Sequence, residues 1–84
     1  MLEISEAVNV WVFFKGSSIE PWCFFWNSRQ IKIDKINLVH TSRDGNNMFY
    51  HFSVSSGGNF YRLKFDTKKL NWLLEVVDEN DSSY

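Results

Sequence analysis

Apolar and polar residues alternate with a period of two along most of the chain, which predicts β-strands. In residues 8–14 the even positions carry Val or Phe and form one apolar face. Trp11 and Phe13 make the opposite face apolar too, so we expect this strand to be covered on both sides at its middle. Gly and Ser at 16–18 end the strand, and residues 22–26 predict a second one.

The next segment shows a change of phase. Ile31 and Ile33 alternate with polar residues, but the apolar series resumes at Ile36 and Leu38, a slip of one residue around Asp34. Such a slip predicts a β-bulge within one continuous strand, because a bulge inserts a single residue and bends the strand. Small barrels need a bend of this kind to curl the sheet.

The second half of the chain predicts three more strands. Residues 41–47 are polar and predict a turn before an alternating strand at 48–54. Ser and Gly at 55–58 predict a hairpin that returns through 60–65. Residues 70–77 fit either a strand or one face of a helix; we favour the strand, because a short segment after a hairpin usually pairs with its neighbour.

These segments predict an all-β protein with about six short antiparallel strands. The expected arrangement is a meander that forms a small SH3-like barrel or a barrel-like sandwich. The 84 residues leave room for one domain. We expect a lead-in at 1–6, a single β domain at 7–78 and a disordered acidic tail at 79–84.

The aromatic residues divide into two sets by phase. The set expected in the core is Phe24, Trp26, Tyr50, Phe52, Tyr61, Phe65 and Trp72. The set on the opposite phase is Trp11, Phe13, Trp22, Phe25, Phe49 and Phe60. One small core does not need the second set, so we expect its first four members to form an exposed patch. Such a patch predicts an interaction module that binds a protein partner or a second copy of the chain.

Charge suggests an alternative function. The net charge is −1, yet residues 29–69 carry eight basic and three acidic side chains. Arg29, Arg62 and Lys64 are the candidates for anion contact, which would give weak, salt-sensitive nucleic-acid binding. Against this, the isoelectric point is near 6.0, whereas dedicated nucleic-acid binders are usually basic. Lys and Arg also protect sheet edges from pairing with other chains.

Motifs that carry catalysis are absent from the sequence. His40 and His51, the only histidines, lie near the two ends of the 41–47 turn, without the compact spacing of a metal site. No serine lies in a nucleophile elbow, and the glycines form no phosphate-binding loop. We therefore expect no enzyme activity, no catalytic residue, no metal, no cofactor and no small-molecule substrate.

Cysteine usage and hydropathy suggest a cytoplasmic protein. Cys23 is the only cysteine, so no intramolecular disulfide can form, which fits a reducing compartment. Its apolar neighbours predict a buried, inert thiol. The longest apolar runs have five residues, too few for a membrane helix, and the N-terminus lacks the apolar core of a signal peptide.

Several of these residues also suggest a family. The resemblance is carried by Pro21, Phe24, Trp26, Arg29, Ile31, Ile33, the segment 61–66, Trp72 and Leu74. Over roughly residues 8–77, the chain resembles a group of small uncharacterised bacterial β-domains. Those domains share the proline, an aromatic-x-Trp-x-x-Arg strand and turn, a twisted strand and a late Trp-x-Leu strand. The resemblance implies an all-β fold without an established activity. Some relatives accompany polymerase-like repair proteins, which implies nucleic-acid contact by association only.

Overall fold

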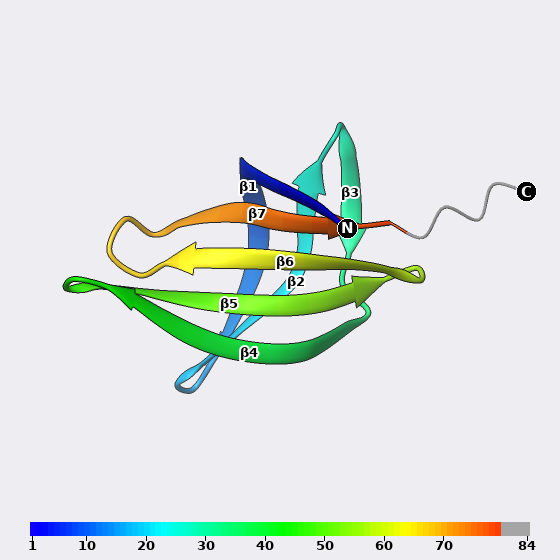
Figure 1. The fold of residues 1–84 in the computed structure, drawn as a ribbon. Helices are drawn as coiled ribbons and strands as arrows, with labels where there is room; N and C mark the ends of the chain where they lie inside the picture. Colours follow the sequence, from blue (N-terminus) through cyan, green and yellow to red (C-terminus); the bar gives the residue numbers. More distant parts are fainter. Residues whose placement is uncertain (80–84) are drawn as a thin grey trace, which may run out of the picture.

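The computed structural model describes residues 1–79, which form seven antiparallel strands and no helix (Figure 1). The strands are β1 (Leu2–Lys15), β2 (Ser18–Trp26), β3 (Arg29–Lys32), β4 (Lys35–Asp44), β5 (Asn47–Ser56), β6 (Asn59–Asp66) and β7 (Asn71–Asp78). The all-β prediction is confirmed, with seven strands in place of about six. The ambiguous segment at 70–77 is a strand from Asn71 onward, and this strand, β7, extends to Asp78. Of the tail predicted at 79–84, all but Glu79 lies outside the described residues.

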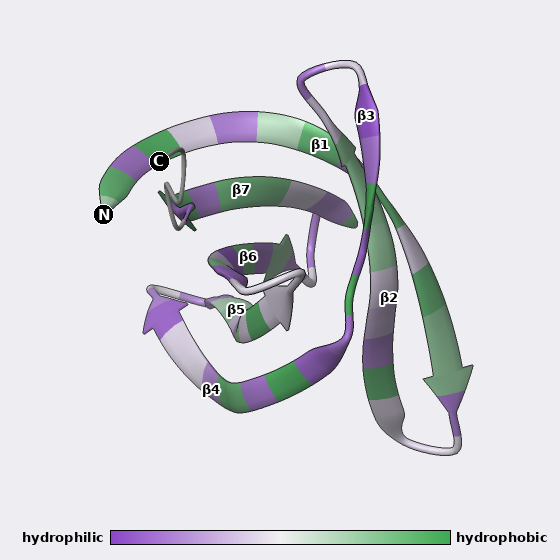
Figure 2. Ribbon diagram, turned by 90° about the vertical axis from the view of Figure 1, so that its right-hand side faces the viewer, coloured by the Kyte–Doolittle hydropathy of each residue, from purple (hydrophilic) through white to green (hydrophobic). Residues whose placement is uncertain are grey.

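The strands form one sheet in the order β3-β2-β1-β7-β6-β5-β4. Two meanders, β1–β3 and β4–β7, are joined through the pairing of β1 with β7. In Figure 1 the strands β4–β7 lie roughly side by side, and β1–β3 cross them steeply. Figure 2 shows how the sheet curls, with β4 bending beneath β5 and β6. The result is a half-barrel whose concave side holds the core.

The expected single bulged strand across Asp34 is wrong. The chain breaks its pairing between β3 and β4, and these two strands lie at opposite edges of the sheet. The Ile33 N–H donates to the Trp22 carbonyl at 2.8 Å, and the Asp34 N–H donates to the Ser55 carbonyl at 2.8 Å. The phase slip therefore marks a crossing from one edge to the other. The register between β4 and β5 shifts slightly later in the chain, between Ile36 and Leu38.

β1 is long because it serves both meanders. It pairs with β7 from Leu2 to Val8 and with β2 from Asn9 to Lys15. Residues 2–6, predicted as a lead-in, are thus part of the sheet. From Asn9 onward, where β1 pairs with β2 and no longer with β7, the β1–β2 hairpin extends past the rest of the sheet (Figure 2).

The core confirms most of the predicted inner aromatic set. Phe24, Phe52, Tyr61, Phe65 and Trp72 are buried, whereas Trp26 and Tyr50 are half-buried against the core. Aliphatic residues of β5, β6 and β7 fill the space between the rings: Val54, Leu63, Leu74 and Val77. The rings of Phe24 and Tyr61 meet edge to face at 5.3 Å between centroids. This contact packs β2 against β6 across the concave side, so the curl of the sheet closes the core.

The β2–β3 hairpin shows why a tight turn follows Trp26. Asn27 and Ser28 both have positive φ, 57° and 61°. Two consecutive left-handed residues match the right-handed twist of a two-residue hairpin, and Asn adopts this conformation at low cost. This turn places Arg29 at the start of an edge strand.

Candidate partner-binding surface

The four aromatic residues predicted to form a patch all lie on the β1–β2 hairpin. Trp11, Phe13, Trp22 and Phe25 are 45%, 57%, 49% and 44% exposed, respectively. The rings of Trp11 and Phe25 meet edge to face with centroids 6.4 Å apart. We call these four residues the aromatic patch. Their exposure is confirmed, and their role in binding a partner stays a prediction.

The strand register explains why the patch faces outward. Val10 lies opposite Phe24 on the core side, so the next pair, Trp11 and Cys23, faces the other way. The register between β1 and β2 shifts at Trp22, which has no partner residue across the strand pair. Pro21 and Cys23 on either side of it are fully buried. Trp22 itself, the extra residue of this bulge, is 49% exposed, and bulges frequently redirect side chains near functional sites.

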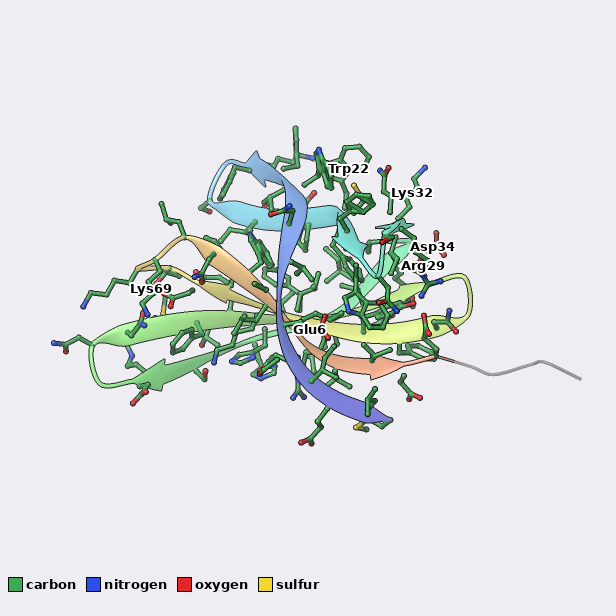
Figure 3. The ribbon with its side chains drawn as sticks, turned by 90° about the horizontal axis from the view of Figure 1, so that it is seen from above. Glu6, Trp22, Arg29, Lys32, Asp34 and Lys69 are labelled. Carbon is green, nitrogen blue, oxygen red and sulfur yellow. The ribbon has the colours of Figure 1, made fainter. Side chains whose placement is uncertain are left out.

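A groove of about 550 Å³ adjoins the aromatic patch. Its walls come from the hairpin and from the crossing segment that leads into β4: Phe13, Glu20, Pro21, Trp22, Ile33, Asp34, Lys35 and Ile36. Figure 3 shows Trp22, Lys32 and Asp34 at the same end of the molecule. Phe13 and Trp22 belong to both the patch and the groove, so the two form one continuous surface.

One edge of β2 borders this groove. β3 is short and pairs only with Cys23 to Trp26 of β2, and Ile33 adds one bond to the Trp22 carbonyl. From Ser18 to Pro21, β2 has β1 on one side and no strand on the other within residues 1–79. Pro21 cannot donate a backbone hydrogen bond, and proline is tolerated where a strand has such an open edge.

Arg29, the first candidate for anion contact, already has an internal partner. Its Nη2 lies 2.6 Å from Glu79 Oε2, and its guanidinium lies 5.8 Å from the centroid of the Trp26 ring. The hydrogen bond to Glu79 raises the pKa of Arg29, and the same bond lowers the pKa of Glu79. Tyr61 also donates to Glu79, at 2.8 Å, and burial raises the pKa of its hydroxyl.

Arg62 and Lys64, the other two candidates, lie on the convex face of β6, apart from Arg29 in the sheet. Arg62 Nε contacts Glu75 Oε1 at 3.2 Å. The Lys64 ammonium lies 4.2 Å from the centroid of the Phe49 ring, so it partly covers that aromatic side chain. The three cations therefore do not form one basic surface, and two of them contact carboxylates.

The same convex face brings together a hydrogen-bonded cluster that sequence reasoning missed. Ser42 Oγ and His51 Nε2 are 2.7 Å apart, and His51 Nδ1 and Glu75 Oε1 are 2.8 Å apart. The His40 ring stacks on His51 at 4.5 Å between centroids. The hairpin of β4 and β5 brings the two histidines together, as pairing of the strands on either side of the 41–47 turn predicts, whereas Glu75 joins from β7. No group of three or more His, Cys, Asp or Glu within residues 1–79 is arranged to hold a metal ion.

Comparisons with protein-family models, curated proteins and solved structures found no match. In the described part of the chain, no helix has the length and apolar character needed to cross a membrane. Function must therefore be inferred from the aromatic patch, the groove and the convex face themselves.

Proposed function

We propose that this protein is a small interaction module whose aromatic patch and groove bind an extended segment of a partner protein. The observation that carries the proposal is the exposure of four large aromatic side chains, at 44–57%, on one hairpin. A soluble protein rarely leaves so much contiguous apolar surface in water unless a partner covers it. Trp and other aromatics are also the residues that contribute most to interface energies.

The energy available is sufficient for a reversible complex. An aromatic side chain buries about 150–250 Å² when fully covered, so covering the remaining half of four rings removes about 400 Å² from water. At about 25 cal/mol per Å² this corresponds to on the order of 10 kcal/mol before the cost of association. That cost is of similar size, so the patch alone supports a transient complex rather than a permanent one.

The open edge of β2 supports an extended segment as the occupant. A partner strand that adds to Ser18–Pro21 gains main-chain hydrogen bonds, and the groove beside it accepts the strand's alternate apolar side chains. The groove carries two carboxylates, Glu20 and Asp34, and one ammonium, Lys35, so its net negative charge favours a partner segment with a basic residue beside its apolar ones.

The proposal also includes a fold family, the SH3-like barrels, and a cytoplasmic location. The strong curl and the two backbone bonds of the crossing segment 33–34 support assignment to the SH3-like barrels. The lone, fully buried Cys23 supports a cytoplasmic protein, because oxidising compartments favour disulfide frameworks in small domains.

Selection from a displayed library of random 12-residue peptides tests the proposal. We expect the wild type to enrich peptides with alternating apolar residues. Labelled amides at Ser18–Glu20, at Trp22 and at 33–36 should shift when a selected peptide binds. Trp22→Ser should weaken binding at least tenfold, because a buried aromatic anchor is worth more than about 1.4 kcal/mol.

Phe60→Ser is the matched control, since Phe60 is 54% exposed but lies on β6, outside the patch. It should bind the selected peptides as the wild type does. Enriched peptides that bind both variants equally would overturn the proposal. Self-association that Trp22→Ser abolishes would instead identify a second copy of the chain as the occupant.

A further inference from the structure

The convex face of β4, β5 and β7 lies away from the aromatic patch. Ser42, His51 and Glu75 form a linear hydrogen-bonded relay, with 2.7 Å from Ser42 Oγ to His51 Nε2 and 2.8 Å from His51 Nδ1 to Glu75 Oε1. An acid that orients a histidine, which in turn contacts a hydroxyl, is the arrangement that activates serine nucleophiles on unrelated folds.

The hydrogen bonds fix the direction of the relay. A carboxylate can only accept, so the Nδ1–H of His51 donates to Glu75. In the neutral imidazole the lone pair of Nε2 is then left to accept the Ser42 proton. Arg62 Nε also contacts Glu75 Oε1, at 3.2 Å, which adds positive charge beside the carboxylate. His51 is only 8% exposed, and the stacked His40 ring covers one of its faces. The imidazole is therefore held in place.

Ser42 is exposed, in contrast to His51, because β4 is an edge strand. Alternate backbone N–H groups of β4 face away from β5, and no other strand of residues 1–79 pairs with them. Unpaired N–H groups next to a nucleophile are suitable donors to a developing oxyanion. Ser42 does not line the groove beside the aromatic patch, so this site is separate from that groove.

We propose that Ser42 is an activated nucleophile that accepts the acyl group of small activated esters, with His51 as the general base and Glu75 as its positioning residue. Ser42 Oγ bonds to the carbonyl carbon as its proton passes to His51 Nε2. The bond from that carbon to the leaving oxygen then breaks, and Nε2 returns the proton to the leaving group. Water releases the acid by the same steps: its oxygen attacks the acyl carbon as its proton passes to Nε2. The bond from that carbon to Ser42 Oγ then breaks, and Nε2 returns the proton to Oγ.

Acetylation by p-nitrophenyl acetate tests this inference on the full chain. We expect a burst of about one p-nitrophenolate per chain and an acetyl group on Ser42, detected by intact-mass spectrometry and peptide mapping. Ser42→Ala should abolish both, and the substitution is mild because the side chain is exposed. Ser53→Ala is the matched control, because Ser53 lies two residues from His51 on the same strand. In this variant p-nitrophenyl acetate should acetylate Ser42 at the wild-type rate.

Glu75→Gln separates positioning from a structural role. It should slow Ser42 acetylation at least tenfold while circular dichroism stays unchanged, and Glu75→Asp should restore part of the rate. In ¹⁵N spectra of the imidazole, His51 should be protonated at Nδ1 in the wild type and redistribute between tautomers in Glu75→Gln. Acetyl groups found only on lysines, or at Ser42 and Ser53 at equal rates, would overturn the inference.

Discussion

Arg29 Nη2 and Glu79 Oε2 lie 2.6 Å apart although 50 residues separate them in the sequence. Glu79 Oε2 also accepts the hydroxyl proton of Tyr61 at 2.8 Å. Arg29 begins β3 at one edge of the sheet, while Tyr61 lies on β6 and Glu79 follows β7, so none of these strands is a sheet neighbour of β3. The contact thus spans the concave side, and it helps hold the curl of the half-barrel.

This contact predicts an acid-sensitive part of the stability. Arg29 lowers the pKa of Glu79, so the native state favours the carboxylate. The resulting stabilisation is fully present above the ordinary value of 4.5 and is lost as the pH falls through the lower native value. The pair is partly exposed, so Glu79→Gln should cost about 0.2–1 kcal/mol at pH 7. Urea unfolding midpoints at pH 7 and pH 3 should show this difference shrinking on acidification. Glu3→Gln, a control outside the contact, should show no such convergence.

The turn before β7 holds a residue under backbone strain. Leu70 has φ of 57° and is 71% exposed, so it gains little packing in return for a left-handed conformation. Asp66 fixes the turn, because its Oδ1 accepts the N–H groups of Lys68 and Lys69. Leu70→Gly should therefore stabilise the fold by about 1 kcal/mol, which raises Tm by about 4–8 °C in a domain of this size.

Leu70→Val provides the opposite test of the same strain. A β-branched residue tolerates positive φ poorly, so this variant should melt below the wild type in the same calorimetric scan. A glycine variant that melts no higher than the wild type would show that the turn carries no strain.

Two phenylalanines on the same strand pair should respond very differently to truncation. Phe24 is 0% exposed, whereas Phe14 is 65% exposed near the tip of the hairpin. Phe24→Ala should cost about 3–5 kcal/mol, a large fraction of the 5–15 kcal/mol that stabilises a typical domain. Phe14→Ala should change the free energy of unfolding by about 0.5 kcal/mol or less. Chemical denaturation of the two variants compares them directly, and equal losses would contradict the described core.

The tryptophans should differ in their access to a quencher. Trp11 and Trp22 are 45% and 49% exposed, and Trp72 is 8% exposed. Iodide should therefore quench part of the fluorescence, and Trp11→Phe or Trp22→Phe should each reduce the quenchable part. Trp72→Phe should instead reduce the protected part. The reverse pattern would mean that another segment covers the aromatic patch.

Local alternation was sufficient to predict much of this protein. A strand turns successive side chains to opposite faces, so sequence phase separates core from surface without knowledge of the partner strands. Phe24, Phe52 and Trp72 were placed in the core on this basis, and Trp11 and Trp22 on the opposite face. The turns after Trp26 and in the segment 55–58 were equally local, since their residue types favour the left-handed conformation.

Tertiary structure decided which distant residues meet. The phase slip at Asp34 fits both a bulge and a crossing between sheet edges, and only the bonds to Trp22 and Ser55 distinguish them. Glu75 reaches His51 because β7 lies beside β6, which lies beside β5. Alternation predicts on which face of the sheet a side chain lies, but strand order and register follow from long-range pairing of the whole chain. For that reason the exposed aromatic patch was predictable from the sequence, whereas the groove beside it and the Ser42–His51–Glu75 relay were not.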